Sequence, residues 1–159
     1  GIIEMNPNGG YFRANRGVLF NTDTAAANIL DDYEEGSYTP VVTASSGSAT
    51  YTTQTGTYTK IGNVVTINVY VQANKNNLNG PLKVSLPIAC GAENRGQEYD
   101  WYVPGGTAIL TTNMRITAGA SIISMYGNTA AGVDGTARQF QASDVQGEMY
   151  FWISMTYKV

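Results

Sequence analysis

Hydrophobic and polar residues alternate with a period of two in the two longest patterned segments of the chain. Residues 63–73 place one set of apolar side chains on a common face: Val65, Ile67, Val69 and Val71. The C-terminal segment 148–159 does the same with Met149, Phe151, Ile153, Met155, Tyr157 and Val159. Successive side chains of a strand point to opposite faces, so both segments are predicted to be strands with one buried face. Tyr150 and Trp152 fall on the second face, and we expect that face to be covered as well.

Further strand segments follow one another at hairpin spacing. Residues 50–60 and 63–73 predict a hairpin, because Gly62 in the turn can adopt a positive φ. Shorter strands are expected at 38–43, 82–86, 105–112 and 121–126, with linkers at 74–77, 91–100 and 127–135. About seven to nine strands at this spacing predict an all-β fold, a jelly-roll-like β-sandwich.

The N-terminal part follows a different pattern. Residues 1–6 and 11–20 are expected to be extended around a turn at 7–10. Thr22 or Asp23 can cap one short helix that ends at Gly36. Its apolar stripe has helical spacing and consists of Ala26, Ile29, Leu30 and Tyr33. We therefore expect an arm and helix over 1–36 and a sandwich over 37–159, with the stripe at subunit contacts.

Composition limits the classes of function. The chain has 159 residues, 13% charged residues and a formal net charge of −3. It has no basic run for nucleic-acid binding and no apolar stretch of about 20 residues that would cross a membrane. The low charge and the many Thr, Ser, Asn and Tyr residues indicate wide polar faces of the kind that pack against sister subunits. An ordinary soluble β domain is the alternative.

Two motifs carry a family resemblance. The run from Leu30 to Pro40 reads L-D-D-Y-E-E-G-S-Y-T-P, and the run from Gly56 to Val65 reads G-T-Y-T-K-I-G-N-V-V. In this order they resemble a module of phage tail spikes and fibres, over roughly residues 29–71. The chain is most similar to the C-terminal intramolecular chaperone domain of the preneck appendage spikes of small Bacillus phages.

This resemblance implies a homotrimeric autochaperone in the host cytoplasm. The domain would align three copies of the upstream spike shaft and then leave by single-turnover self-cleavage, so that the mature virion lacks it. The cut would follow a Ser, and Gly1 would be the new N-terminus. The resemblance also allows ATP as a ligand that promotes cleavage, with no required cofactor. Trimerising first would raise the local concentration of the shafts to about millimolar, which helps slow, non-local β-structure to form.

Candidate residues for the cleavage are few. The chain has no His, which excludes a Ser-His-Asp triad and a Cys-His dyad within it. Cys90, in an apolar segment, is expected to be a buried small side chain rather than a nucleophile. Glu4 lies beside Ile3 and Met5, where desolvation could raise its pKa and make it a general base or acid. A solvated strand residue is the alternative for Glu4.

Two charged clusters are considered as further sites, one for an anion and one for a metal ion. Arg13 and Arg16 could hold a phosphate or the oxyanion of the cleavage step, although no glycine-rich phosphate loop accompanies them. We favour salt bridges between these arginines and the acidic run Asp31, Asp32, Glu34 and Glu35. The run lacks the D-x-D-x-D-G spacing of a calcium loop, so no metal site is expected there.

A third cluster is aromatic. Tyr99, Trp101 and Tyr102 precede Pro104 and Gly105, and exposed aromatic side chains on a loop can stack on sugar rings. We favour packing at an interface rim for them. The alternative function is therefore a carbohydrate-binding or receptor-binding tip domain of a fibre or spike, and a third is a purely structural trimer cap.

Overall fold

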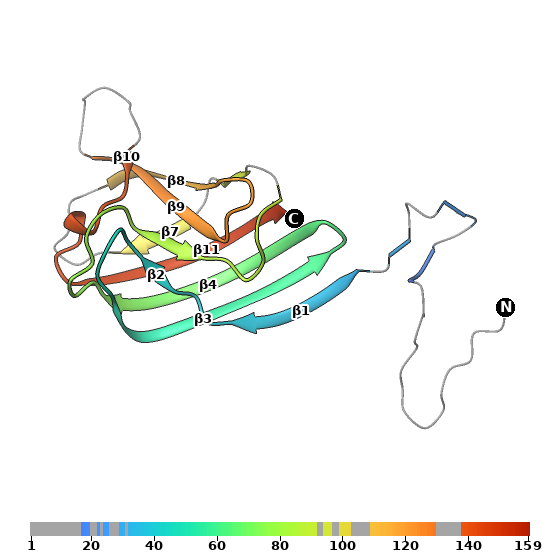
Figure 1. Cartoon of the computed structure of the whole chain (residues 1–159), viewed down its shortest axis with the longest axis horizontal. Coiled ribbons are helices and arrows are strands. Elements are labelled where there is room, and N and C mark those ends of the chain that lie inside the picture. Colours follow the sequence, from blue (N-terminus) through green and yellow to red (C-terminus); the bar gives the residue numbers. More distant parts are fainter. Residues whose placement is uncertain are drawn as a thin grey trace.

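The strand pattern of the sequence is realised as two antiparallel sheets (Figure 1). The computed structural model describes residues 17–19, 22, 24, 25, 29, 30, 32–91, 94–96, 99–102, 109–129 and 138–159. Most of these residues lie in strands. The chain is therefore all-β in the part that the structure describes.

The first sheet contains the two longest patterned segments side by side. Its order is β1-β3-β4-β11-β7, with bounds Tyr33–Tyr38, Thr50–Ile61, Val64–Asn74, Glu148–Lys158 and Tyr99–Tyr102. β4 and β11 pair from Val64↔Lys158 to Asn74↔Glu148, over the full length of both strands. Segments from the middle and the C-terminal end of the chain thus form the centre of this sheet.

The second sheet is built from shorter strands. Its order is β2-β5-β9-β8-β6, with bounds Val42–Thr43, Lys83–Ser85, Ile122–Thr129, Ile109–Ile116 and Asn94–Gly96. β10 (Arg138–Gln139) pairs with β9, and a 3-10 helix η2 (Ala142–Asp144) leads into β11. The sequence predicts a linker at 91–100, but β6 and the start of β7 lie there. These residues have no clear alternating pattern, and they form strands because they pair with β8 and β11.

The β3–β4 hairpin confirms the predicted turn. Ile61 pairs with Val64, which leaves Gly62 and Asn63 as the turn residues. Gly62 has φ +57°, in the left-handed region that glycine adopts without steric cost. Its N–H donates to the carbonyl of Asp32 at 2.8 Å, so the turn is also joined to the chain just before β1.

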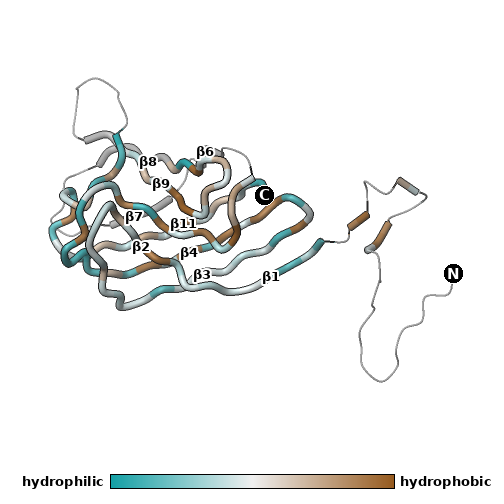
Figure 2. Tube along the Cα trace, in the orientation of Figure 1, coloured by the Kyte–Doolittle hydropathy of each residue, from teal (hydrophilic) through white to brown (hydrophobic). Residues whose placement is uncertain are grey.

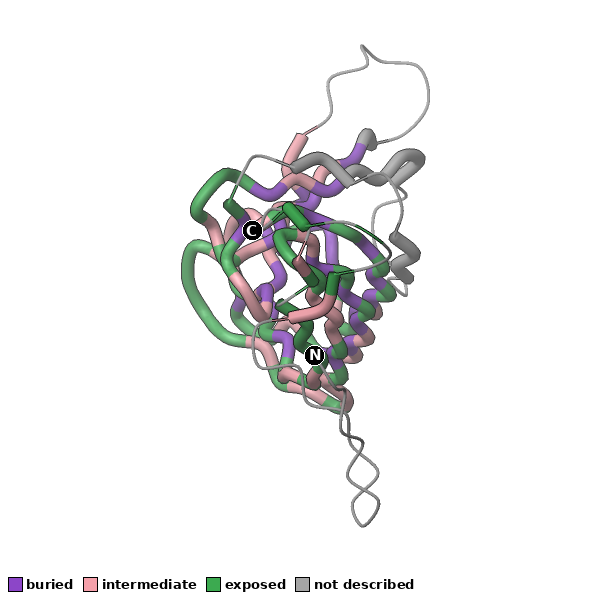
Figure 3. Tube along the Cα trace, turned by 90° about the vertical axis from the view of Figure 1, so that its right-hand side faces the viewer, coloured by how far each residue is buried: buried purple, intermediate pink, exposed green. Residues whose placement is uncertain are grey.

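One hydrophobic core is formed by the inner faces of the two sheets. Val65, Ile67, Val71 and Phe151 are fully buried, as the alternation predicts. The second sheet contributes buried residues to the same cluster: Val42, Val84, Met114, Ile116, Ile123 and Met125. Brown hydrophobic positions alternate with polar ones along β4 and β11 (Figure 2), and buried with exposed positions (Figure 3). Cys90 is buried in this cluster, as expected.

Buried tyrosines connect the two layers by bonding to backbone. The Tyr157 hydroxyl donates to the carbonyl of Ile88 at 2.8 Å, and the Tyr51 hydroxyl donates to the carbonyl of Val42 at 3.1 Å. Burial disfavours the phenolate, so it raises the pKa of Tyr157 to about 12 and also raises the pKa of Tyr38. These hydroxyls supply hydrogen bonds to backbone carbonyls in β2 and in the segment after β5.

The prediction of an N-terminal helix is wrong for the described residues of that segment. Tyr33–Tyr38 form strand β1, and Leu30 makes an antiparallel bridge with Val18. The described residues contain no helix longer than η2. β1 obtains a full ladder from the edge of β3, a tertiary gain that outweighs the local helical spacing of the apolar residues. The boundary expected after residue 36 consequently falls inside β1, and Ala26 lies outside the described residues.

Candidate assembly and binding surface

The outer face of the five-stranded sheet points away from the core. Its side chains come from alternate positions of β1, β3, β4 and β11, and the register places them in rows across the sheet. The end nearest the β3–β4 turn is called the turn end here, and the opposite end the aromatic end. The two ends carry different chemistry.

The turn end is apolar and exposed. Its row runs Tyr33, Ile61, Val64 and Lys158 in register. Tyr33 is 59% exposed and Ile61 is 51% exposed. Leu30, just before β1, is exposed as well. Large apolar side chains that lie next to one another in water mark a surface where another molecule can bind, because covering them lowers the free energy.

The middle of the face is polar and carries little charge. One row contains Ser37, Thr57, Asn68 and Ser154, and the row before it contains Glu35, Thr59, Thr66 and Thr156. The hydroxyl oxygens of Thr66 and Thr156 lie 2.9 Å apart and share a hydrogen bond across the strands. These short side chains make a surface of hydroxyl and amide groups.

The aromatic end brings together three rings. Tyr70 and Trp152 are register partners, with ring centroids 5.2 Å apart, and Tyr150 lies two residues from Trp152 on the same face. The ring centroids of Tyr150 and Trp152 are 6.1 Å apart, and the rings are nearly parallel, at 10°. Trp152 remains 42% exposed, so the expectation of a covered second face is not met within the chain.

The two sequence motifs lie side by side as β1 and β3. Asp32 forms an ion pair with Lys60, and the Tyr58 hydroxyl donates to Glu34. Glycines make room for the tyrosines: a Cβ on Gly36 would lie 2.9 Å from the Tyr58 ring, and one on Gly56 would lie 2.5 Å from the Tyr38 ring. Each motif thus supplies the partners of the other, and this arrangement accounts for the residue types in both.

Three carboxylates of the acidic run have partners within β1 and β3, and the expected salt bridges to Arg13 and Arg16 fall outside the described residues. Asp32 and Glu34 have the partners just described, and the Tyr33 hydroxyl donates to Glu35 at 2.6 Å, which raises the pKa of Tyr33. Within the described ranges, no group of three His, Cys, Asp or Glu side chains is placed to hold a metal ion. Asp31 lies outside those ranges.

The predicted cleavage and anion residues all fall in the N-terminal segment before residue 17. Gly1, Glu4, Arg13 and Arg16 lie outside the residues that the structure describes. Of the expected subunit contacts, Ile29 is half-buried, and Leu30 and Tyr33 are exposed, on a bridge and a strand rather than on one helix. Tyr99, Trp101 and Tyr102 were expected on a loop, but their backbone forms β7, paired with β11.

Sequence reasoning missed two clusters. The first is the aromatic end, whose signal was present because Tyr70, Tyr150 and Trp152 all fall on the polar faces of their strands. The register that makes them neighbours was the missing fact. The second is a network of buried polar contacts around η2, in a segment without a recognisable pattern.

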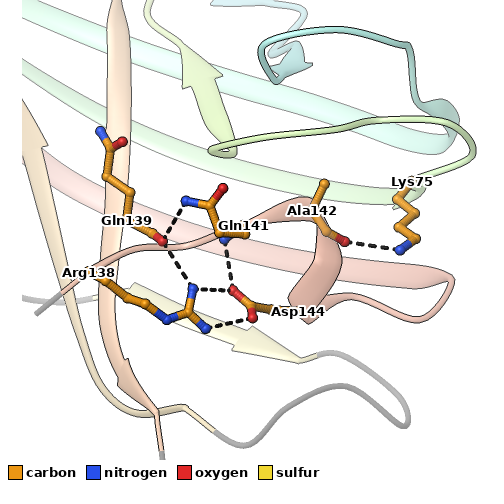
Figure 4. A network of polar contacts seen from close by, with 6 residues as sticks. All are labelled: Lys75, Arg138, Gln139, Gln141, Ala142 and Asp144. Carbon is orange, nitrogen blue, oxygen red and sulfur yellow. Dashed lines mark hydrogen bonds and ion pairs between the residues drawn. The ribbon is translucent and has the colours of Figure 1, made fainter.

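Asp144 is the centre of this network (Figure 4). It is 6% exposed and accepts two hydrogen bonds from the Arg138 guanidinium, at 2.6 and 2.8 Å. Asp144 also accepts from the backbone N–H of Gln141 at 2.8 Å, and this contact caps η2. Lys75 donates to the carbonyl of Ala142 at 3.0 Å. The hydrogen bond to Asp144 raises the pKa of Arg138, and the two bonds between these side chains hold β10 against η2.

Comparison with known proteins does not assign the chain to a family. No model of a known protein family matches the chain, and no curated protein is significantly similar to it. No helix in the described part of the chain is long and apolar enough to cross a membrane. Any function must therefore be argued from the residues and surfaces above.

Proposed function

We propose that this chain is the C-terminal assembly domain of a phage tail spike, which promotes homotrimer formation and is then released by self-cleavage just before Gly1. The observation that carries the proposal is the exposed apolar turn end, where Leu30, Tyr33 and Ile61 are open to solvent. The L-D-D-Y-E-E-G motif runs directly through this end. The sandwich would have a jelly-roll-like topology and would associate as a trimer.

The physical reasoning concerns association before folding of the shaft. Apolar burial contributes about 25 cal/mol per Å², so covering the turn end with a second and third copy would favour a closed ring of subunits. Three tethered shafts would then begin in register, at about millimolar local concentration. Cleavage would separate the finished shaft from this domain, and Glu4 would act as the general base or acid.

Association is tested by sedimentation of the isolated chain at micromolar concentration. The wild type is expected to sediment as a trimer, and Tyr33→Ala is expected to shift it toward monomer. Thr57→Ala, which changes a polar residue in the middle of the same face, serves as the matched control and should leave the trimer intact. A wild type that is monomeric at these concentrations contradicts the proposal.

Cleavage is tested separately, in the full-length polypeptide. Mass spectrometry should detect a fragment that begins at Gly1, and Glu4→Gln should slow its appearance. Glu35→Gln is the control, because it removes a carboxylate of β1 outside the proposed site. Release at the wild-type rate in Glu4→Gln removes the role of Glu4, and the absence of any fragment removes self-cleavage.

A further inference from the structure

We propose that Tyr70, Tyr150 and Trp152 form a binding platform for a neutral oligosaccharide or polysaccharide chain. The platform lies at the aromatic end of the outer sheet face, opposite the turn end that the assembly proposal uses. The inference therefore does not rest on trimer formation or on cleavage. It also differs from the aromatic cluster of β7 that the sequence suggested.

The first argument is the arrangement of the rings. Tyr70 and Trp152 are directly opposite each other on paired strands, with a 31° angle between their planes. Tyr150 is nearly parallel to Trp152. Centroid separations of 5.2 and 6.1 Å are close to the length of one hexose unit in an extended glycan. The three rings thus form one contiguous aromatic patch that neighbouring units of a sugar chain can contact.

The second argument is that the platform is held in place without the ligand. The Tyr150 hydroxyl donates to Glu148 at 2.9 Å and accepts from the Gln72 side-chain amide at 3.4 Å. Both strands that carry the rings belong to the centre of the sheet and have their other faces in the core. Aromatic side chains have few rotatable bonds, so little conformational entropy is lost when a ligand binds.

The third argument is chemical complementarity. The C–H groups on one face of a pyranose ring carry partial positive charge, which matches the negative face of an aromatic ring. Hydroxyl and amide groups flank the rings and can bond to sugar hydroxyls: Thr55, Asn68, Gln72 and Ser154. Glu148 is a charged residue in the neighbouring row, and Asp100 of β7 is the register partner of Trp152, so an anionic glycan would meet two acidic positions. A neutral glycan fits these groups best.

A second copy of the chain fits this end less well. The centre of a protein interface is usually apolar with a polar rim, whereas here the aromatic rings border directly on rows of Thr, Asn and Ser. Such polar rows would lose water on contact with another protein surface and gain few defined partners. Sugar hydroxyls supply both donors and acceptors to the same rows.

Binding is tested by isothermal titration of the intact chain with cellohexaose, chitohexaose and maltohexaose, and with oligogalacturonate as the charged probe. At least one neutral hexasaccharide is expected to bind, and the charged probe to bind more weakly. Trp152→Ala is expected to weaken binding about tenfold or more, Tyr70→Ala less, and Trp152→Phe least. Val41→Ala changes an exposed apolar side chain just before β2 of the other sheet and should leave glycan affinity unchanged.

A second measurement does not depend on how well the alanine variants fold. The chain has two tryptophans, so Trp101→Phe leaves Trp152 as the sole indole. Its emission is expected to shift to shorter wavelength as the bound glycan excludes water. The proposal is overturned if no neutral probe binds or shifts this emission. It is also overturned if Trp152→Ala keeps full affinity, or if that variant changes the oligomeric state instead.

Discussion

On β4 and β11, the inner face and the outer face are built from alternate residues of the same two strands. The inner residues Val65, Ile67 and Phe151 are fully buried, whereas the outer residue Trp152 is 42% exposed. Both faces have the same backbone, register and hydrogen bonds. The inner face therefore sets the stability of the fold, and the outer face is free to carry recognition at little cost in stability.

The largest expected difference in stability between the faces comes from two neighbouring aromatic residues on β11. Phe151→Ala leaves a cavity in the core and should lower the free energy of unfolding by about 3–5 kcal/mol. Trp152→Ala removes an exposed ring and its contact with Tyr70, with an expected loss of about 1 kcal/mol. Urea unfolding of both variants checks this. Losses of equal size would mean that the outer face is part of the stabilising core.

The second-largest expected effect on stability comes from a buried charge away from β4 and β11. Asp144→Ala removes two hydrogen bonds from the Arg138 guanidinium and the acceptor of the Gln141 N–H, and should cost about 2–3 kcal/mol in urea unfolding. Glu148→Ala is the control, since this exposed carboxylate lies at the start of β11 and should change the stability by about 0.5 kcal/mol or less. If both variants are equally stable, the Asp144 network does not hold β10 and η2 together.

The glycine contacts of the inner face provide a steric test. Gly56→Ala would place a Cβ 2.5 Å from the Tyr38 ring and is expected to destabilise the fold by about 1–2 kcal/mol. Gly147→Ala is the matched control, because the nearest atom to its Cβ would be 3.9 Å away. The thermal unfolding midpoints of the two variants distinguish these outcomes. An unchanged midpoint for Gly56→Ala would show that Tyr38 moves aside without cost.

The smallest effect concerns pH. The folded-state pKa of Tyr157 is raised to about 12, above the usual value of about 10, so the folded state binds more protons in this window. Its contribution to stability is fully present below about pH 10 and is lost as the pH rises toward 12. Tyr157→Phe should lose about 1 kcal/mol at neutral pH and show a shallower alkaline decline. An identical alkaline decline in both proteins would assign it to other groups.

The sequence by itself determined the central strands. Period-2 alternation in residues 63–73 and 148–159 predicted β4 and β11 and their buried faces, because burial of one face requires that pattern. Gly62 predicted the hairpin turn, because few other residues adopt its conformation. The buried state of Cys90 followed in the same way from its apolar neighbours.

Only the tertiary structure decided the rest. Residues 33–36 were expected to end the helix, yet they belong to β1, because the open edge of β3 offers a ladder that local preferences cannot reveal. Tyr70 lies about 80 positions before Tyr150 and Trp152 in the sequence and becomes their neighbour through the β4–β11 register. Asp144 and Arg138 meet through irregular backbone around η2. Local patterns report which face of a strand is buried, but long-range pairing determines which strands and side chains meet.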